Sequence, residues 1–129
     1  MKIAIIGWGY LIRDRRGLDV APQWQPDGPH LPLEFARCAD PPRIVPVLVA
    51  GAPPKPTFWT LSQKRSMLAA AADLAVREGV GTHEIGQWSR EDSMRKPVGV
   101  EGVIAAWIEA KGLDGAVWRE PGWGRPPAA

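Results

Sequence analysis

An apolar run followed by a glycine-spaced turn lies near the N-terminus, in the segment Lys2-Ile3-Ala4-Ile5-Ile6-Gly7-Trp8-Gly9-Tyr10-Leu11-Ile12. Residues 3–6 form a short, continuous apolar run rich in isoleucine, and this composition predicts a β-strand that is buried on both faces. Gly7 and Gly9 then allow backbone conformations with positive φ and let the backbone approach a ligand without a Cβ atom in the way. A core strand that ends in such a turn can present backbone N–H groups to an anion. We therefore treat this turn as one half of a candidate site.

A dinucleotide-binding fingerprint is the first alternative for the glycine turn. The spacing Gly-x-Gly is present at residues 7–9, but the third glycine of the fingerprint would fall on Ile12. Residues 13–17, which follow, lack the apolar stripe of a helix. The sequence argues against dinucleotide binding, and we expect no cofactor.

The overall composition indicates a folded domain. The 129 residues are enough to bury a core, the apolar fraction is 45%, and the 14 glycines and 14 prolines predict many turns and short elements. The net charge of +2 and the single tight basic cluster, at residues 13–16, argue against a nucleic-acid partner. We expect one domain over residues 1–120, followed by a Pro/Gly-rich tail at residues 121–129.

Metal and disulfide chemistry find little support in the sequence. Cys38 is the single cysteine, so no internal disulfide can form. The sequence spacing of His30 and His83 from Cys38 is not that of a metal site, so we predict no metal. The apolar N-terminal run is too short to span a membrane and lacks a small-residue cleavage site. We expect a cytoplasmic protein with no membrane association.

Periodicity predicts a first half that is rich in strands. Apolar and polar or small residues alternate over residues 31–36, which predicts a half-buried strand. Residues 43–50 predict the next strand, joined to it as a hairpin. Pro46 lies inside that strand and cannot donate a ladder hydrogen bond, so we expect an edge position or a bulge there. Residues 57–61 predict a further short strand.

Two helices are predicted in the second half. The first spans residues 62–78, with Ser62 as its N-cap and Gly79 after its last residue. Its apolar side is predicted from Met67, Leu68, Leu74 and Ala75. The second helix spans residues 100–111 and ends before Gly112.

Short strands at residues 83–89 and 113–118 complete the predicted elements. The predicted order is β-β-β-β-α-β-α-β, which is not a regular βαβ alternation. We therefore predict an α+β domain with a small mixed, barrel-like β-sheet and two packed helices.

Two short motifs resemble the γ-glutamylcyclotransferase-like fold family. In that family a strand near the N-terminus runs into a loop that reads Tyr-Gly-Ser-Asn or Tyr-Gly-Ser-Leu. The matching positions in this chain are Trp8, Gly9, Tyr10 and Leu11. The family's catalytic glutamate precedes a glycine after the helix that follows the barrel strands, and Glu78, followed by Gly79, looks like its counterpart. The resemblance covers residues 2–118 in the order of elements, but only these two motifs in residues.

The resemblance implies an enzyme without metal or cofactor that cyclises a γ-glutamyl amine or peptide to 5-oxoproline and releases the amine. The free α-amino group attacks the γ-carbonyl of the same molecule, and one carboxylate can move the proton from that nitrogen to the leaving nitrogen. Glu78 is the implied catalytic residue, and backbone N–H groups of residues 9–11 would hold the substrate's carboxylate. The implied partner is a small molecule with a γ-glutamyl group, and a homodimer is compatible with the resemblance.

Departures from the family pattern leave a second function open. Trp8 replaces the family's usual tyrosine, and Tyr10 stands where a small serine lets the loop approach the ligand. A bulky residue there can narrow the pocket or change what it accepts. The alternative is a non-catalytic member of the same fold that binds a small acid or a protein partner.

Other titratable residues are weaker candidates. Glu78 places a negative charge in the last turn of a helix, against the macrodipole, which is a mild sign of function. Glu34 and Glu84 are reserve carboxylates for which a surface role is the simpler interpretation. Cys38 and His83 can be posed as a nucleophile and its base, but a buried, inert cysteine is much commoner.

Overall fold

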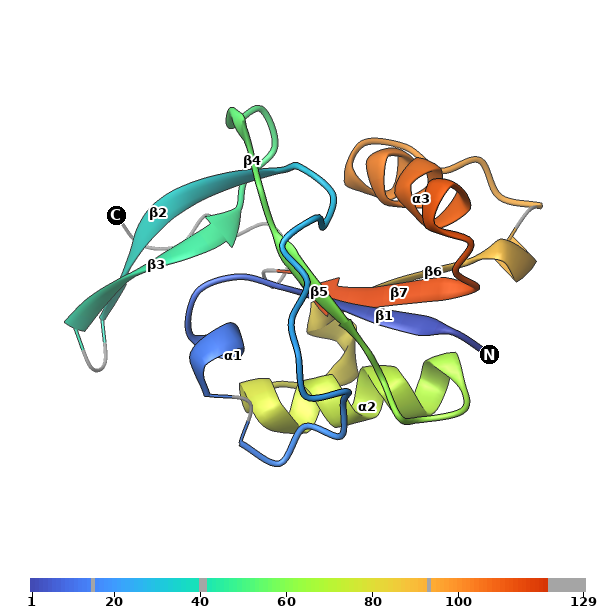
Figure 1. Cartoon of the computed structure of the whole chain (residues 1–129). Coiled ribbons are helices and arrows are strands. Elements are labelled where there is room, and N and C mark those ends of the chain that lie inside the picture. The colour runs from blue at the N-terminus through green and yellow to red at the C-terminus, as the bar shows by residue number, and fades with distance from the viewer. Residues whose placement is uncertain (15, 40–41, 93, 121–129) are drawn as a thin grey trace.

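A four-stranded mixed sheet lies at the centre of the molecule in the computed structural model (Figure 1). Its strands run in the order β5-β1-β7-β6, with the bounds Phe58–Leu61, Ile3–Gly7, Gly115–Arg119 and Ile85–Ser89. β1 pairs parallel with β7 and antiparallel with β5, and β6 pairs antiparallel with β7. The structure describes residues 1–14, 16–39, 42–92 and 94–120, so the predicted tail at residues 121–129 lies outside the described residues.

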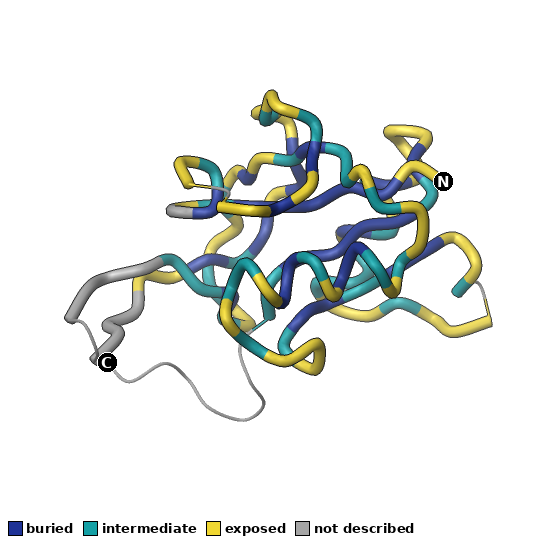
Figure 2. Tube along the Cα trace, turned by 90° about the horizontal axis from the view of Figure 1, so that it is seen from below, coloured by how far each residue is buried: buried dark blue, intermediate teal, exposed yellow. Residues whose placement is uncertain are grey.

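The central strand β1 is buried along its whole length, which confirms the prediction from its sequence. Ile3 and Ile5 point into one apolar cluster, and Ala4 and Ile6 point into another on the opposite face, because successive side chains of a strand alternate. Buried residues accordingly run through the middle of the chain trace in Figure 2. A strand between two covered faces needs a continuous apolar run rather than an alternating one.

A second, three-stranded antiparallel sheet has the order β3-β2-β4, with the bounds Pro42–Leu48, Leu31–Ala39 and Pro54–Lys55. β2 and β3 form the predicted hairpin, in which Phe35 lies opposite Pro46. β3 is the edge strand of this sheet, so the edge position expected for Pro46 is confirmed.

The α+β class and the mixed pairing are confirmed, but the described strands do not close into a barrel. They divide into two sheets instead. The physical reason is that β2 meets the four-stranded sheet through apolar side chains, Leu31 and Leu33, which share a cluster with Ala4 and Ile6, rather than through a hydrogen-bonded ladder. The start of β2 and the end of β3 therefore pack over one face of the central sheet, and the hairpin does not continue its edge.

Two main helices pack against opposite faces of the central sheet (Figure 1). α2 spans Met67–Glu78 and buries Ala70, Ala71 and Leu74 in the cluster that contains Ile3 and Ile5. The small alanines let the helix approach the sheet closely.

The other helix, α3, spans Val100–Lys111 as predicted and buries Ile104 and Ile108 in the cluster on the other face. The helix ends predicted at Gly79 and Gly112 are confirmed, with φ of 70° and 69°. None of the helices in the described part of the chain is long and apolar enough to cross a membrane.

The predicted start of the first helix is wrong by one turn. Ser66, not Ser62, is the N-cap, and its hydroxyl accepts a hydrogen bond from the Ala69 N–H at 3.1 Å. Ser62 instead donates its backbone N–H to the carbonyl of Ile3 and so still belongs to the strand ladder. Leu68, predicted on the apolar side, is 74% exposed.

Short helical turns connect these elements. α1 spans Tyr10–Arg13, and 3-10 turns span Thr82–Glu84 (η1) and Arg90–Asp92 (η2). The strand predicted from residue 83 therefore begins two residues later, at Ile85, because η1 takes up the start of that segment.

A polar cluster around Asp27 fastens α3 to the loop that precedes β2. The Asp27 carboxylate accepts a hydrogen bond from Trp59 Nε1 at 2.7 Å and pairs with the Lys111 ammonium, and the Asp27 carbonyl accepts one from Trp107 Nε1 at 3.0 Å. The rings of Trp59 and Trp107 meet edge to face, with centroids 5.4 Å apart. The hydrogen bond from Lys111, and after it the one from Trp59, lowers the pKa of Asp27 below its usual value.

Candidate functional site

The glycine turn that follows β1 lies against the edge strand of the second sheet. Gly9 has a φ of 65°, in the left-handed region that residues with a Cβ atom rarely adopt. A Cβ atom at Gly9 would also lie 3.3 Å from Cγ of Pro46, which is tighter than an ordinary contact. Glycine is required here for both reasons, and the turn is held close to β3.

Trp8 bridges the two sheets. Its backbone continues directly from β1, and its indole Nε1 donates a hydrogen bond to the Pro46 carbonyl at 3.0 Å. The side chain is half-buried. The indole is therefore placed by a rigid central strand at one end and by β3 at the other.

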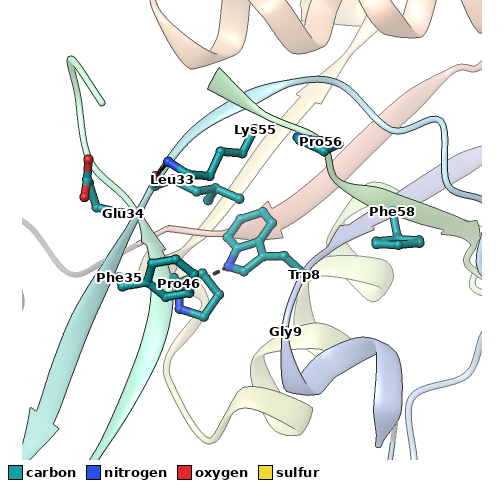
Figure 3. Close-up of a pocket in the computed structure, with 9 residues that line it drawn as sticks. All are labelled: Trp8, Gly9, Leu33, Glu34, Phe35, Pro46, Lys55, Pro56 and Phe58. Atoms are coloured by element: carbon teal, nitrogen blue, oxygen red, sulfur yellow. Dashed lines mark hydrogen bonds between the residues drawn. The ribbon is translucent and has the colours of Figure 1, made fainter. Parts of the chain in front are cut away.

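A cavity of about 290 Å³ opens beside this turn (Figure 3). Its apolar lining residues are Trp8, Leu33, Phe35, Pro46, Pro56 and Phe58. The remaining lining residues are Gly9, Glu34 and Lys55. The cavity thus lies between the turn after β1, the hairpin β2–β3 and the segment from β4 to β5.

Lys55 and Glu34 are the ionisable residues of this cavity. The Lys55 ammonium donates a hydrogen bond to the Leu33 carbonyl at 2.7 Å, and the side chain is half-buried. Glu34 is exposed, and Figure 3 shows its carboxylate turned away from the Trp8 indole. An apolar cavity with an ammonium beside it can bind a small ligand that combines an apolar body with an anionic group.

Glu78, the predicted catalytic carboxylate, is not among the residues that line this cavity. It ends α2, where its carboxylate lies 3.1 Å from Nη1 of Arg77. Arg77 Nε also donates a hydrogen bond to the Asp14 carbonyl at 2.8 Å. The charge that opposes the helix dipole is therefore balanced locally by Arg77, next to the segment that follows α1.

The four loop residues predicted to bind substrate are divided between different surroundings. Trp8 and Gly9 line the cavity. The Leu11 side chain is 5% exposed and belongs to the apolar cluster under α2, together with Leu74. Tyr10 begins α1, and its side chain lies outside what the structure describes.

The remaining candidates take part in surface contacts or lie outside the described side chains. Glu84 lies 3.3 Å from Nη2 of Arg119 and 3.8 Å from Nε2 of His83, so it belongs to an ion cluster at η1 and β7. His30 is exposed, and the side chain of Cys38 is outside the description. Within the described residues, no group of three or more His, Cys, Asp or Glu side chains could hold a metal ion.

Sequence reasoning missed Lys55, Pro56 and Phe58 as cavity residues. Lys55 and Pro56 fall between the predicted strands at residues 43–50 and 57–61, and Phe58 was predicted only as part of the second of these strands. A usable signal was the spacing Pro54-Lys55-Pro56, because a residue that precedes proline is restricted to extended backbone and is therefore held in a defined orientation.

Comparison with known proteins assigns no family: no family model, curated protein or solved structure matches this chain.

Proposed function

We propose that this protein is a γ-glutamylcyclotransferase-like enzyme that binds its substrate in the cavity beside Trp8 and Gly9. One observation carries the proposal. The turn that the resemblance associates with the γ-glutamyl group lines a cavity of about 290 Å³. This volume lies at the lower end of the range for small-ligand pockets, which begins at about 300 Å³, so the cavity suits a compound as small as a γ-glutamyl amine.

The proposed reaction forms a bond between the substrate's α-amino nitrogen and its γ-carbonyl carbon and breaks the bond from that carbon to the amine nitrogen. The attacking nitrogen loses a proton, and the leaving nitrogen gains one. A single carboxylate can carry both transfers, because the group that accepts the first proton can donate it in the second. Holding the substrate's own carboxylate favours closure of the five-membered ring.

In this proposal Glu78 is the carboxylate that transfers the proton. Support comes from the end of α2, which contacts the segment after α1 through the hydrogen bond from Arg77 to the Asp14 carbonyl. Leu11 and Leu74 also share one cluster, so α1 and α2 are packed together. Glu34 is the competing carboxylate, because it lines the cavity itself.

The test is release of 5-oxoproline from a panel of γ-glutamyl amines and dipeptides. Glu78→Gln keeps the shape of the side chain and removes its acid–base function, so we expect turnover to fall by about 100-fold or more. Glu84→Gln is the matched control, because it also removes one carboxylate from a surface ion pair, and it should keep full activity. Unchanged thermal unfolding of both variants separates chemistry from folding.

Two outcomes would revise the proposal in different ways. Absence of 5-oxoproline with every substrate would refute the enzymatic function. Full activity of Glu78→Gln together with inactivity of Glu34→Gln would move the proton transfer to Glu34 and retain the reaction.

A specific observation favours a second candidate function, the binding of a small acid without catalysis. Glu78 is held by Arg77 away from the cavity lining, and the lining consists mainly of apolar residues with Lys55 beside them. Such a cavity supplies affinity for an apolar acid, while its own carboxylate, Glu34, is exposed and turned away from the Trp8 indole (Figure 3). Tight binding of such an acid by a protein that releases no 5-oxoproline would establish this function.

A further inference from the structure

We infer that this cavity selects a ligand with a carboxylate and an aromatic-sized apolar body, and that Lys55 is the residue that binds the carboxylate. One part of this inference rests on the proposed function, namely that the ligand is a γ-glutamyl derivative of an aromatic amine. The α-carboxylate then pairs with Lys55, and the amine substituent packs against Trp8 and Phe58.

The first support is the state of the Lys55 ammonium. One of its three N–H donors is used by the Leu33 carbonyl, at 2.7 Å, so two remain for a ligand. Among the ion pairs of the described residues, none involves Lys55. Glu34 lines the same cavity, but its carboxylate makes no ion pair with Lys55 and is turned away from the Trp8 indole (Figure 3). Beside an apolar wall a charge is screened less than in open water, so an ammonium that makes no ion pair with the described residues favours an anionic ligand.

The second support is the way Lys55 is held. It forms β4 with Pro54, and this short strand pairs with the beginning of β2. Pro56 follows and restricts its backbone further. The lysine is thus positioned before a ligand arrives, which lowers the entropy lost on binding.

The third support is the apolar surface left open around the cavity. Phe35 is 69% exposed and Phe58 is 37% exposed, and both line this cavity, so apolar surface gathers there. Figure 3 shows the Trp8 indole between Pro46 on one side and Phe58 on the other. An aromatic ring of the ligand would cover this surface, whereas a small or polar amine would leave it exposed to water.

Binding can be tested without turnover. Isothermal titration calorimetry would compare 3-phenylpropionate with 3-phenylpropanamide, which lacks the charge, and with propionate, which lacks the ring. We expect 3-phenylpropionate to bind at least about 10-fold more tightly than either analogue. Equal affinity of the acid and the amide for the wild-type protein would overturn the inference.

Variants of Lys55 assign the carboxylate site. Lys55→Met should abolish the preference for the acid over the amide, and Lys55→Arg should retain it because the charge is kept. Lys96→Met, in an exposed lysine away from the cavity, should behave as the wild type. An acid preference that survives in a folded Lys55→Met protein would contradict the role of Lys55.

Turnover separates failure of this inference from failure of the proposed enzyme. With γ-glutamyl-2-phenylethylamide and γ-glutamylmethylamide as substrates, we expect kcat/KM for 5-oxoproline release to be at least about 10-fold higher for the aromatic amide. Phe58→Ala should reduce that ratio. Equal turnover of both amides would refute the inference while the enzyme stands, whereas selective binding without any turnover would refute the enzyme while the ligand class stands.

Discussion

The two sheets of this molecule differ in how completely they are covered. The four-stranded sheet has α2 on one face and α3 with the start of β2 on the other, and every residue of β1 is buried. The three-stranded sheet is buried where Leu31 and Leu33 meet the central sheet, but farther along β2 the side chain of Phe35 is 69% exposed. The four-stranded sheet, here called the closed sheet because both of its faces are covered, supplies most of the buried core. The three-stranded sheet, here called the open sheet, supplies apolar surface that a ligand can cover, together with Phe58 at the start of β5.

Trp8 connects the two regions. It follows a strand that has no exposed residue, and its indole reaches the edge strand of the open sheet through the Pro46 carbonyl. A binding residue that extends from a rigid element is held more exactly than one on a free loop. The contrast between the sheets therefore explains why the cavity lies at their junction.

The largest expected effect comes from truncating a buried side chain of β1, in the closed sheet. Ile5 is fully buried, so Ile5→Ala should lower the free energy of unfolding by about 3–4 kcal/mol, through lost burial and the cavity left behind. Phe35→Ala, in the open sheet, should change it by less than about 1 kcal/mol. Urea unfolding followed by tryptophan fluorescence measures the free energy of unfolding of both variants. Similar decreases in the two variants would contradict the difference in burial between the two sheets.

An intermediate effect is expected at the turn that joins the sheets. Gly9→Ala should lower the free energy of unfolding by about 1–2 kcal/mol, because alanine disfavours the positive φ and its Cβ would crowd Pro46. Gly17 is a matched control, since its φ is not positive and no atom lies within 4 Å of an added Cβ. Gly17→Ala should be neutral or stabilising by up to about 1 kcal/mol. Equal destabilisation by both variants would show that the conformation of the turn is unimportant.

The smallest effect concerns the attachment of α3 to the closed sheet by Asp27. Because Lys111 and Trp59 lower the pKa of Asp27 in the folded state, its contribution to stability is fully present above the ordinary pKa of an aspartate and is lost as the pH falls through the lower, folded-state pKa. The thermal midpoint of the wild type should therefore exceed that of Asp27→Asn at neutral pH, and the difference should shrink progressively as the pH falls below the ordinary pKa of an aspartate.

Salt provides a second check on the same cluster. Asp27 is exposed, so added salt should also reduce the difference in thermal midpoint between the wild type and Asp27→Asn. A difference that is independent of both pH and salt would show that the carboxylate charge is not what fastens α3.

Much of the fold could be predicted because it depends on neighbours in the chain. The continuous run of β1 required burial on both faces, Pro46 required an edge strand, and the glycines after α2 and α3 ended both helices. The predicted start of α2 was wrong because Ser62 is a good N-cap by type, yet it forms an antiparallel bridge with Val20 and donates its backbone N–H to the carbonyl of Ile3, so it stays extended. A tertiary hydrogen bond there overrides the local preference.

Only one part of the candidate site, the glycine turn that follows β1, could be predicted from the sequence. The turn at Trp8 and Gly9 is visible in the residues themselves, since glycine spacing and a preceding apolar strand are local features. That Lys55 and Phe58 line the same cavity, while Glu78 pairs with Arg77 outside it, followed from the folded chain. The division into two sheets has the same origin, because whether a strand joins a neighbour by hydrogen bonds or lies across it through apolar side chains depends on contacts between distant segments, which local periodicity does not encode.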